Sequence, residues 1–225
     1  MIPLRDDNPI SSVPVITIAI VALCVIVFIW ELLLPLDTAQ NVMYALGFVP
    51  AVLFGHGELR TPIVPPGVTI FTAMFLHGGW LHLAGNMLYL WIFGDNIEDR
   101  MGPGRFVVFY LVCGLIAALA QALPDVRSTV PMIGASGAIS GVLGAYTVLY
   151  PRANVLVALP VLIIFYTFRV PAFIVLGFWF LVQLASSLGA GTGGGVAFRA
   201  HVGGFVAGVL LIRLFLRERS RHHTV

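Results

Sequence analysis

The sequence is short of charged residues. Of 225 residues only 10% are charged, 59% are hydrophobic, and the mean hydropathy is +1.00. Soluble domains carry about 25% charged residues, so this composition excludes an ordinary soluble protein and indicates an integral membrane protein. The chain has no lysine, and its net charge of +2 is too small to predict a nucleic-acid partner.

Cysteine is scarce, and a signal peptide is missing. Cys24 and Cys113 both lie in apolar segments, which favours packed thiols over a disulfide. The polar N-terminus, MIPLRDDNPISS, has no signal-peptide pattern, and no small-residue cleavage site follows the first apolar run. We therefore expect that run to remain as a membrane helix.

Long apolar runs are what the sequence does contain. A membrane span needs about 20 apolar residues, and six runs qualify. A seventh run, 155–168, is shorter and contains Pro160, so it suits an interfacial or re-entrant segment better; whether it enters the bilayer is left open. The six expected spans are 13–34, 70–94, 105–123, 131–150, 170–188 and 199–216.

The arginines predict the orientation of the chain. Four of them follow residue 212, and Arg5 lies near the start, so both termini are expected in the cytoplasm. Termini on the same side need an even number of spans. The predicted fold is therefore all-α, a polytopic bundle of six transmembrane helices in the plasma membrane of a prokaryote. Its expected parts are a cytoplasmic segment 1–12, a membrane domain 13–216 and a basic cytoplasmic tail 217–225.

Polar side chains at membrane depth are costly and mark candidate functional sites. His82 and Asn86 lie in the second span, Ser136 in the fourth and His201 in the sixth. With the N-terminus inside, these three spans all run from outside to inside. The four residues then fall in the outer half of the bilayer at a similar depth.

Glycines in the fourth and sixth spans favour close helix packing. Gly137 and Gly141 are four residues apart, as are Gly204 and Gly208, and this spacing lets backbones approach closely. Such packing would bring the serine of span four towards the histidine of span six.

Most membrane serines hydrogen bond back to their own helix, and we interpret Ser140, like Gln183, as a structural residue. Ser136 is different because it shares its depth with a histidine that can act as a base. His201 could take the hydroxyl proton and pass it to a leaving amine. We expect a Ser–His dyad without a third, acidic member, since no carboxylate is expected at this depth; Glu98 and its acidic neighbours belong to the cytoplasmic end.

A serine nucleophile also needs donors for the oxyanion that its attack creates. We expect an oxyanion hole formed by the Asn86 amide, a His82 ring N–H and the backbone N–H of Ser136. Gly134 and Gly137 would let a substrate backbone come close.

We predict no metal and no cofactor. His77 and His82 are five residues apart, which is roughly 140° around a helix, so they should point in different directions. The spacing also differs from that of the H-E-x-x-H zinc motif.

Together these motifs resemble the rhomboid intramembrane serine proteases, over roughly residues 70 to 210. The resemblance implies Ser136 as nucleophile, His201 as base, and cleavage of peptide bonds in or beside transmembrane helices of membrane-protein substrates. It also implies a gate at 170–188 and a cap at 189–198. The motifs that carry it are GASG (134–137), AHVGGFVAG (200–208), HGGWLHLAGN (77–86) and GDNIEDRMG (94–102).

The chain departs from the family pattern at two places. Some members have a Trp–Arg pair before the second helix, where this chain reads PPGVTIFT (65–72). Some members place an aromatic ring one turn after the serine, where this chain has Ser140, so how His201 is held stays open.

Two rival functions are weaker. A catalytically silent relative that escorts membrane helices would be expected to lack the serine or the histidine, and both are present. A proton-relay transporter would favour membrane-embedded carboxylates and internal repeats, and the sequence offers no repeat. The natural substrate and the oligomeric state stay open.

Overall fold

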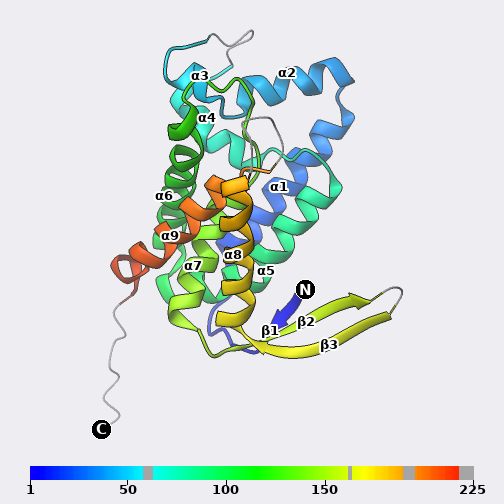
Figure 1. The fold of residues 1–225 in the computed structure, drawn as a ribbon, viewed down its shortest axis with the longest axis vertical. Coiled ribbons are helices and arrows are strands. Elements are labelled where there is room, and N and C mark those ends of the chain that lie inside the picture. Colours follow the sequence, from blue (N-terminus) through cyan, green and yellow to red (C-terminus); the bar gives the residue numbers. More distant parts are fainter. Residues whose placement is uncertain (58–62, 162–163, 190–195, 218–225) are drawn as a thin grey trace.

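The computed structural model describes residues 1–57, 63–161, 164–189 and 196–217. Figure 1 shows a bundle of helices with a small β-sheet at one end and the short helices α2 and α3 at the other. In chain order the elements are β1 (Ile2–Asp6), α1 (Val15–Leu33), α2 (Leu36–Leu46), α3 (Pro50–Leu53), α4 (Pro66–Thr72), the 3₁₀ turn η1 (Ala73–Phe75), α5 (Trp80–Met101), α6 (Pro103–Ala122), the 3₁₀ turn η2 (Leu123–Asp125), α7 (Ser136–Leu149), β2 (Asn154–Val161), β3 (Ile164–Pro171), α8 (Ala172–Gly189) and α9 (Phe198–Phe215).

The chain is a mostly helical, multi-pass membrane protein. Among the described residues, four helical stretches are long and apolar enough to cross a membrane: α1, α6 extended to Asp125, α8 and α9. Helix α5 has 22 residues, but it carries polar residues near its start and four charged residues near its end. Helix α7 is apolar but has only 14 residues. One hydrophobic core joins these six helices.

The second and fourth expected spans begin later than predicted. The run 70–94 is interrupted after Phe75, and α5 starts at Trp80. Helix α7 starts at Ser136, five residues inside the expected span 131–150. Both corrections place a glycine-containing, non-helical segment directly before a helix that carries a candidate site residue.

The segment GDNIEDRMG is helical, although its sequence predicts a turn after the second span. Helix α5 continues through it to Met101, and the turn is made by Gly102, which has a φ of +77°. Glycine adopts this left-handed conformation without steric cost, and Pro103 can open α6 because the first turn of a helix needs no N–H donor there.

Glu98, near the end of α5, caps the start of α1. It is 2% exposed, and its carboxylate accepts hydrogen bonds from the backbone N–H of Ile16 at 2.9 Å and of Thr17 at 2.8 Å. The Thr17 hydroxyl donates a third bond at 2.8 Å. The first N–H groups of a helix have no partner within the helix, so this acceptor both satisfies them and complements the helix dipole.

A three-stranded antiparallel sheet occupies the same end of the bundle, in the order β1-β2-β3. The all-α prediction holds for most of the chain but misses this sheet. The run 155–168 is a β-hairpin, and β1 brings the N-terminal segment against it. β3 is rich in β-branched and aromatic residues and β2 contains three valines, which favours the extended conformation. Because almost all of them are apolar, no alternation in the sequence separated strand from helix.

Two expected segments lie largely outside the described residues. Of the expected cap, 189–198, only the ends are described, and of the expected tail, 217–225, only Arg217 is described.

Candidate active site

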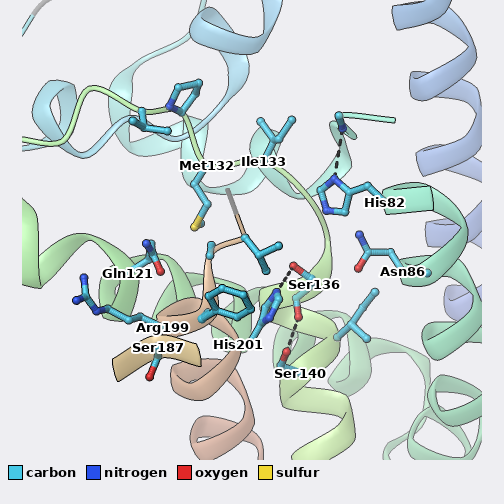
Figure 2. A pocket seen from close by; sticks show the side chains of 18 of the residues that line it. His82, Asn86, Gln121, Met132, Ile133, Ser136, Ser140, Ser187, Arg199 and His201 are labelled. Carbon is cyan, nitrogen blue, oxygen red and sulfur yellow. Dashed lines mark hydrogen bonds between the residues drawn. The ribbon is translucent and has the colours of Figure 1, made fainter. Parts of the chain in front are cut away.

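Three helices begin at one place and bring the candidate residues together. His82 is the third residue of α5, Ser136 is the first of α7, and His201 is the fourth of α9. Figure 2 shows His82, Asn86, Ser136 and His201 lining one pocket. Residues more than a hundred positions apart in the chain therefore share one site.

Ser136 and His201 are in direct contact. The Ser136 Oγ lies 2.7 Å from the His201 Nε2, a hydrogen-bond distance (Figure 2). His201 is 8% exposed, so the pair is largely shielded. A serine hydroxyl beside an imidazole nitrogen is the arrangement that general-base activation requires.

Glycines allow the two helices to come this close. A Cβ added to Gly204 would collide with the carbonyl oxygen of Gly137, and one added to Gly208 would collide with that of Gly141. A Cβ on Gly137 itself would lie 2.7 Å from the Cβ of Ala117 on α6. Packing therefore accounts for Gly137 and Gly204, and the space beside Gly137 belongs to α6 rather than to an approaching substrate.

Ser140 gives an internal comparison for Ser136. Its hydroxyl donates to the carbonyl oxygen of Ser136, four residues earlier, at 2.6 Å, and the side chain is 1% exposed (Figure 2). This is the helix-internal bond expected of an ordinary membrane serine. Of the two serines one turn apart, only Ser136 has its hydroxyl against a histidine.

Gln183 of α8 holds the other side of His201, and the sequence interpretation missed it. The Gln183 Oε1 lies 2.7 Å from the His201 Nδ1. An amide oxygen only accepts, so Nδ1 carries the proton and Nε2 presents its lone pair to Ser136. The ring of Trp179, one turn before Gln183, lies 5.9 Å from the His201 ring. The i, i+4 spacing places Trp179 and Gln183 on one face of α8, but the sequence does not show which helix that face meets.

His82 is held in one tautomer by the loop before its helix. The backbone N–H of Gly78 donates to the His82 Nδ1 at 3.3 Å, so Nδ1 is the acceptor and the proton sits on Nε2 (Figure 2). Asn86 is 7% exposed, and its Nδ2 has no partner within the described chain. Two donors are thus available beside Ser136.

Gly134 lies against both donors. Its φ is +112°, and a Cβ there would lie 2.6 Å from the His82 Nε2 and 3.7 Å from the Asn86 Nδ2. Conformation and close approach both require glycine at this position. The predicted opening for substrate at Gly134 is filled in this structure by the His82 ring.

A second histidine and a carboxylate lie behind His82, contrary to prediction. His77 precedes α5 rather than lying on it, so helical geometry does not apply, and its ring centroid is 5.1 Å from that of His82. Its backbone N–H donates to the Glu31 carboxylate of α1 at 3.3 Å. Glu31 is 6% exposed, so a carboxylate does exist at this end of the bundle, although among the described residues the His201 ring hydrogen bonds to Gln183 and Ser136 and to no carboxylate. Among the described residues no three His, Cys, Asp or Glu side chains gather closely enough to hold a metal.

The site opens into a cavity of about 820 Å³. Besides the four candidate residues, its lining includes Gln121, Trp179 and the loop segment 130–133. This volume matches that of an ordinary ligand pocket, which spans roughly 300–1,000 Å³. A chain segment and attacking water can therefore both be accommodated beside Ser136.

Sequence comparisons place these features among known proteins. A family model described as the Rhomboid domain matches residues 67–218. The chain is 30% identical over 193 residues to Rhomboid protein 1, mitochondrial, of Saccharomyces cerevisiae, covering 76% of this chain and 52% of that protein. It is 34% identical over 200 residues to Rhomboid protease GluP of Bacillus subtilis, covering 87% and 34% respectively. It is 30% identical over 165 residues to RHOMBOID-like protein 5 of Arabidopsis thaliana, covering 69% and 47%. The chain thus spans a third to a half of the length of these relatives.

Proposed function

The chain belongs to the rhomboid family, and from that premise we propose that it is a serine endopeptidase that cleaves peptide bonds in or beside transmembrane helices of membrane-protein substrates. Intramembrane proteolysis is the activity that the family and its protease-named relative support. The observation that carries the proposal to this chain is the 2.7 Å contact between the Ser136 Oγ and the His201 Nε2.

In the proposed mechanism His201 removes the hydroxyl proton of Ser136 while the Oγ attacks the substrate carbonyl carbon. The same nitrogen then gives that proton to the leaving amine as the peptide bond breaks, which leaves an acyl-enzyme. Water hydrolyses the acyl-enzyme by the same proton transfers. Gln183 keeps the His201 Nδ1 protonated and the ring oriented throughout, a positioning role that needs no carboxylate.

The proposed oxyanion hole uses three donors. These are the Asn86 Nδ2, the His82 Nε2–H and the backbone N–H of Ser136, which as the first residue of α7 has no acceptor within its helix. Donors already in place when charge develops contribute more to catalysis than donors that must first reorient.

We also propose how the chain sits in its membrane. Helices α1, α5, α6, α7, α8 and α9 would be the six spans of a domain covering 13–216, with 1–12 and 217–225 in the cytoplasm. One of the relatives named above comes from Bacillus subtilis, a prokaryote. The plasma membrane of a prokaryote is our specific proposal, and substrates would be transmembrane proteins of that membrane.

A fluorophosphonate probe, which reacts with activated serines, tests this proposal on the purified protein. The wild type should be labelled, and Ser136→Ala and His201→Ala should not. Ser140→Ala is the matched control, because it removes a buried serine hydroxyl one turn away and should keep labelling. A folded wild type that stays unlabelled and leaves a transmembrane test substrate uncut would refute the enzyme. The silent helix-escorting relative would then become the better account.

A further inference from the structure

The β2–β3 hairpin has two chemically different faces. Cross-strand partners in an antiparallel pair share a face, and successive pairs alternate between faces. One face carries only apolar and aromatic side chains, whereas the other mixes apolar side chains, including the 64% exposed Phe165, with Asn154, Thr167 and Arg169. We call the first the apolar face of the hairpin. Its outer pairs are Val157–Phe168, Leu159–Tyr166 and Val161–Ile164.

The apolar face is the one turned towards the helices. Val155 and Val157 on this face are both 0% exposed and belong to the core of the bundle. Pro3 of β1, which pairs with Val157, is also buried. Asp6, which pairs with Val155, accepts a hydrogen bond from the Tyr146 hydroxyl of α7. The face that carries Arg169 therefore points away from the bundle.

Further along the strands the same face is uncovered. Leu159, Ile164 and Tyr166 are between 38% and 55% exposed. Figure 1 shows the hairpin running out sideways past the ends of the helices, at a steep angle to their axes. In the membrane arrangement proposed above, on which this inference rests, the helices cross the bilayer and the strands extend along its cytoplasmic surface. The uncovered part of the apolar face then points into the bilayer beside the bundle.

We propose that the apolar face of the hairpin inserts into the cytoplasmic leaflet, at the boundary between headgroups and acyl chains. The chain passes from β3 directly into α8, whose first turn carries Phe173 and Ile174, 50% and 44% exposed. Tyrosine side chains favour this boundary, and Arg169 on the other face can meet anionic headgroups.

The strand order limits how deep the hairpin can go. β3 is an edge strand of the described sheet, so one side of its backbone has no strand partner. Hydrocarbon cannot satisfy those N–H and C=O groups, whereas headgroups and water can. The hairpin therefore lies at the boundary, with its apolar side chains reaching roughly 5–10 Å inward, as interfacial helices do.

Spin labels on adjacent residues of β3 test the proposal. Tyr166→Cys and Thr167→Cys place a nitroxide on opposite faces at neighbouring exposed positions, and Ile174→Cys reports the lipid-facing side of α8. Cys24 and Cys113 are free and fully buried, so they can stay in place with unsubstituted protein as the blank. The measurement is collision with oxygen against collision with a water-soluble nickel chelate, in vesicles of phosphatidylcholine and phosphatidylglycerol.

We expect the labels at 166 and 174 to collide more often with oxygen, and the label at 167 to collide more often with the nickel chelate. Equal nickel access at 166 and 167 would overturn the proposal. So would a label at 166 that is shielded from both reagents, or whose shielding grows with the protein-to-lipid ratio or with an added substrate helix. Those results would identify a second copy or a substrate as the occupant.

Introducing one carboxylate on either face of the hairpin provides a second, independent measurement. Tyr166→Asp should move a nitroxide at Leu159→Cys, on the same face, towards water, whereas Thr167→Asp should leave it unchanged. Both substituted side chains are exposed, so neither change removes packing within the fold. An unchanged label in both variants would overturn the proposal.

Discussion

The two ends of the bundle differ in how many of their buried polar atoms have hydrogen-bond partners. At the sheet end, the Glu98 carboxylate accepts three hydrogen bonds from the start of α1. At the site end, three buried atoms have no partner among the described residues: the Asn86 Nδ2, the His77 Nε2 and the Glu31 Oε1. Asn96, which lies at the sheet end, and Tyr110 are the other described residues with such an atom, so unpaired atoms are more numerous at the site end but are not confined to it.

Paired polar groups at the sheet end stabilise the fold, whereas unpaired groups at the site end are available for chemistry. Leaving a buried polar group unpaired costs about 1–3 kcal/mol, so the site end carries a cost that the sheet end avoids. A donor without a partner in the resting protein is free to bind an oxyanion. Substitutions at the site end should therefore alter rate more than stability, and substitutions at the sheet end should do the reverse.

Asn86→Ala should produce the largest effect and would sharpen the contrast. Loss of one oxyanion donor lowers kcat by roughly 100–1,000-fold. The melting temperature should change little, because the Nδ2 has no hydrogen-bond partner in the part of the chain that the structure describes. Cleavage kinetics and a thermal melt measure the two quantities, with the exposed Asn41→Ala as control. A large loss of stability with unchanged kcat would show that Asn86 stabilises the fold rather than acting in catalysis.

Glu98→Ala tests the sheet end. Removing the acceptor leaves three buried donors without a partner, so the free energy of unfolding should fall by about 2–3 kcal/mol. Activity per folded molecule should stay near that of the wild type. Denaturation in detergent measures the first quantity, and active-site titration the second; Asp37→Ala on exposed α2 is the matched control. Unchanged stability would show that the cap contributes nothing.

Gln183→Leu tests whether a polar contact at the site end also acts on rate. Loss of one neutral hydrogen bond of about 1.4 kcal/mol corresponds to a tenfold fall in kcat, with KM unchanged. Probe labelling of Ser136 should slow by the same factor. Val182→Leu, one residue away on an exposed part of α8, should change neither. A change in KM alone would assign Gln183 to substrate binding instead.

Asp6→Asn gives the smallest effect and adds a pH dependence to the sheet end. Burial raises the pKa of the Asp6 carboxyl above its usual 3.8, outweighing the Tyr146 bond that lowers it, and Asp95 raises it further. The folded chain thus holds this proton to a higher pH than the unfolded chain does. The contribution of Asp6 to stability is full below pH 3.8 and is lost as the pH rises through the folded pKa.

The stability of the wild type relative to Asp6→Asn should therefore fall as the pH is raised from about 3.8. Denaturation of both proteins across the pH range measures this difference. If the stability of the wild type relative to Asp6→Asn instead rises with pH, the fold favours the charged carboxylate.

The parts of the site that sequence could predict are those with unusual chemistry. Ser136 and His201 stood out because a serine and a histidine at matching depth are rare in apolar spans, and the glycine spacing indicated that their helices meet. The structure brings them into contact. Gln183 could not be separated from structural glutamines, because its significance depends on how α8 is rotated against α9. The sequence pattern does not encode that rotation.

The errors in the fold have a common physical origin. Hydropathy reports whether a segment is apolar, not which backbone hydrogen bonds it makes. Apolar composition alone therefore did not show that the run 155–168 pairs as strands. Likewise the sequence predicts no carboxylate at the depth of the site, whereas packing buries Glu31 behind His77 at that level. Both cases needed tertiary contacts to resolve.

The shortness of α7 sets how deep the Ser136 hydroxyl lies in the bilayer. Its 14 residues cover about 21 Å at 1.5 Å per residue, about 9 Å less than a hydrocarbon layer of about 30 Å. If Leu149 lies level with the inner boundary, the Ser136 hydroxyl lies about 9 Å beneath the outer one. A bond that reaches it comes from roughly six residues inside a straight substrate helix. Under the proposed function, adding or deleting a turn of α7 would thus reposition the cut along the substrate.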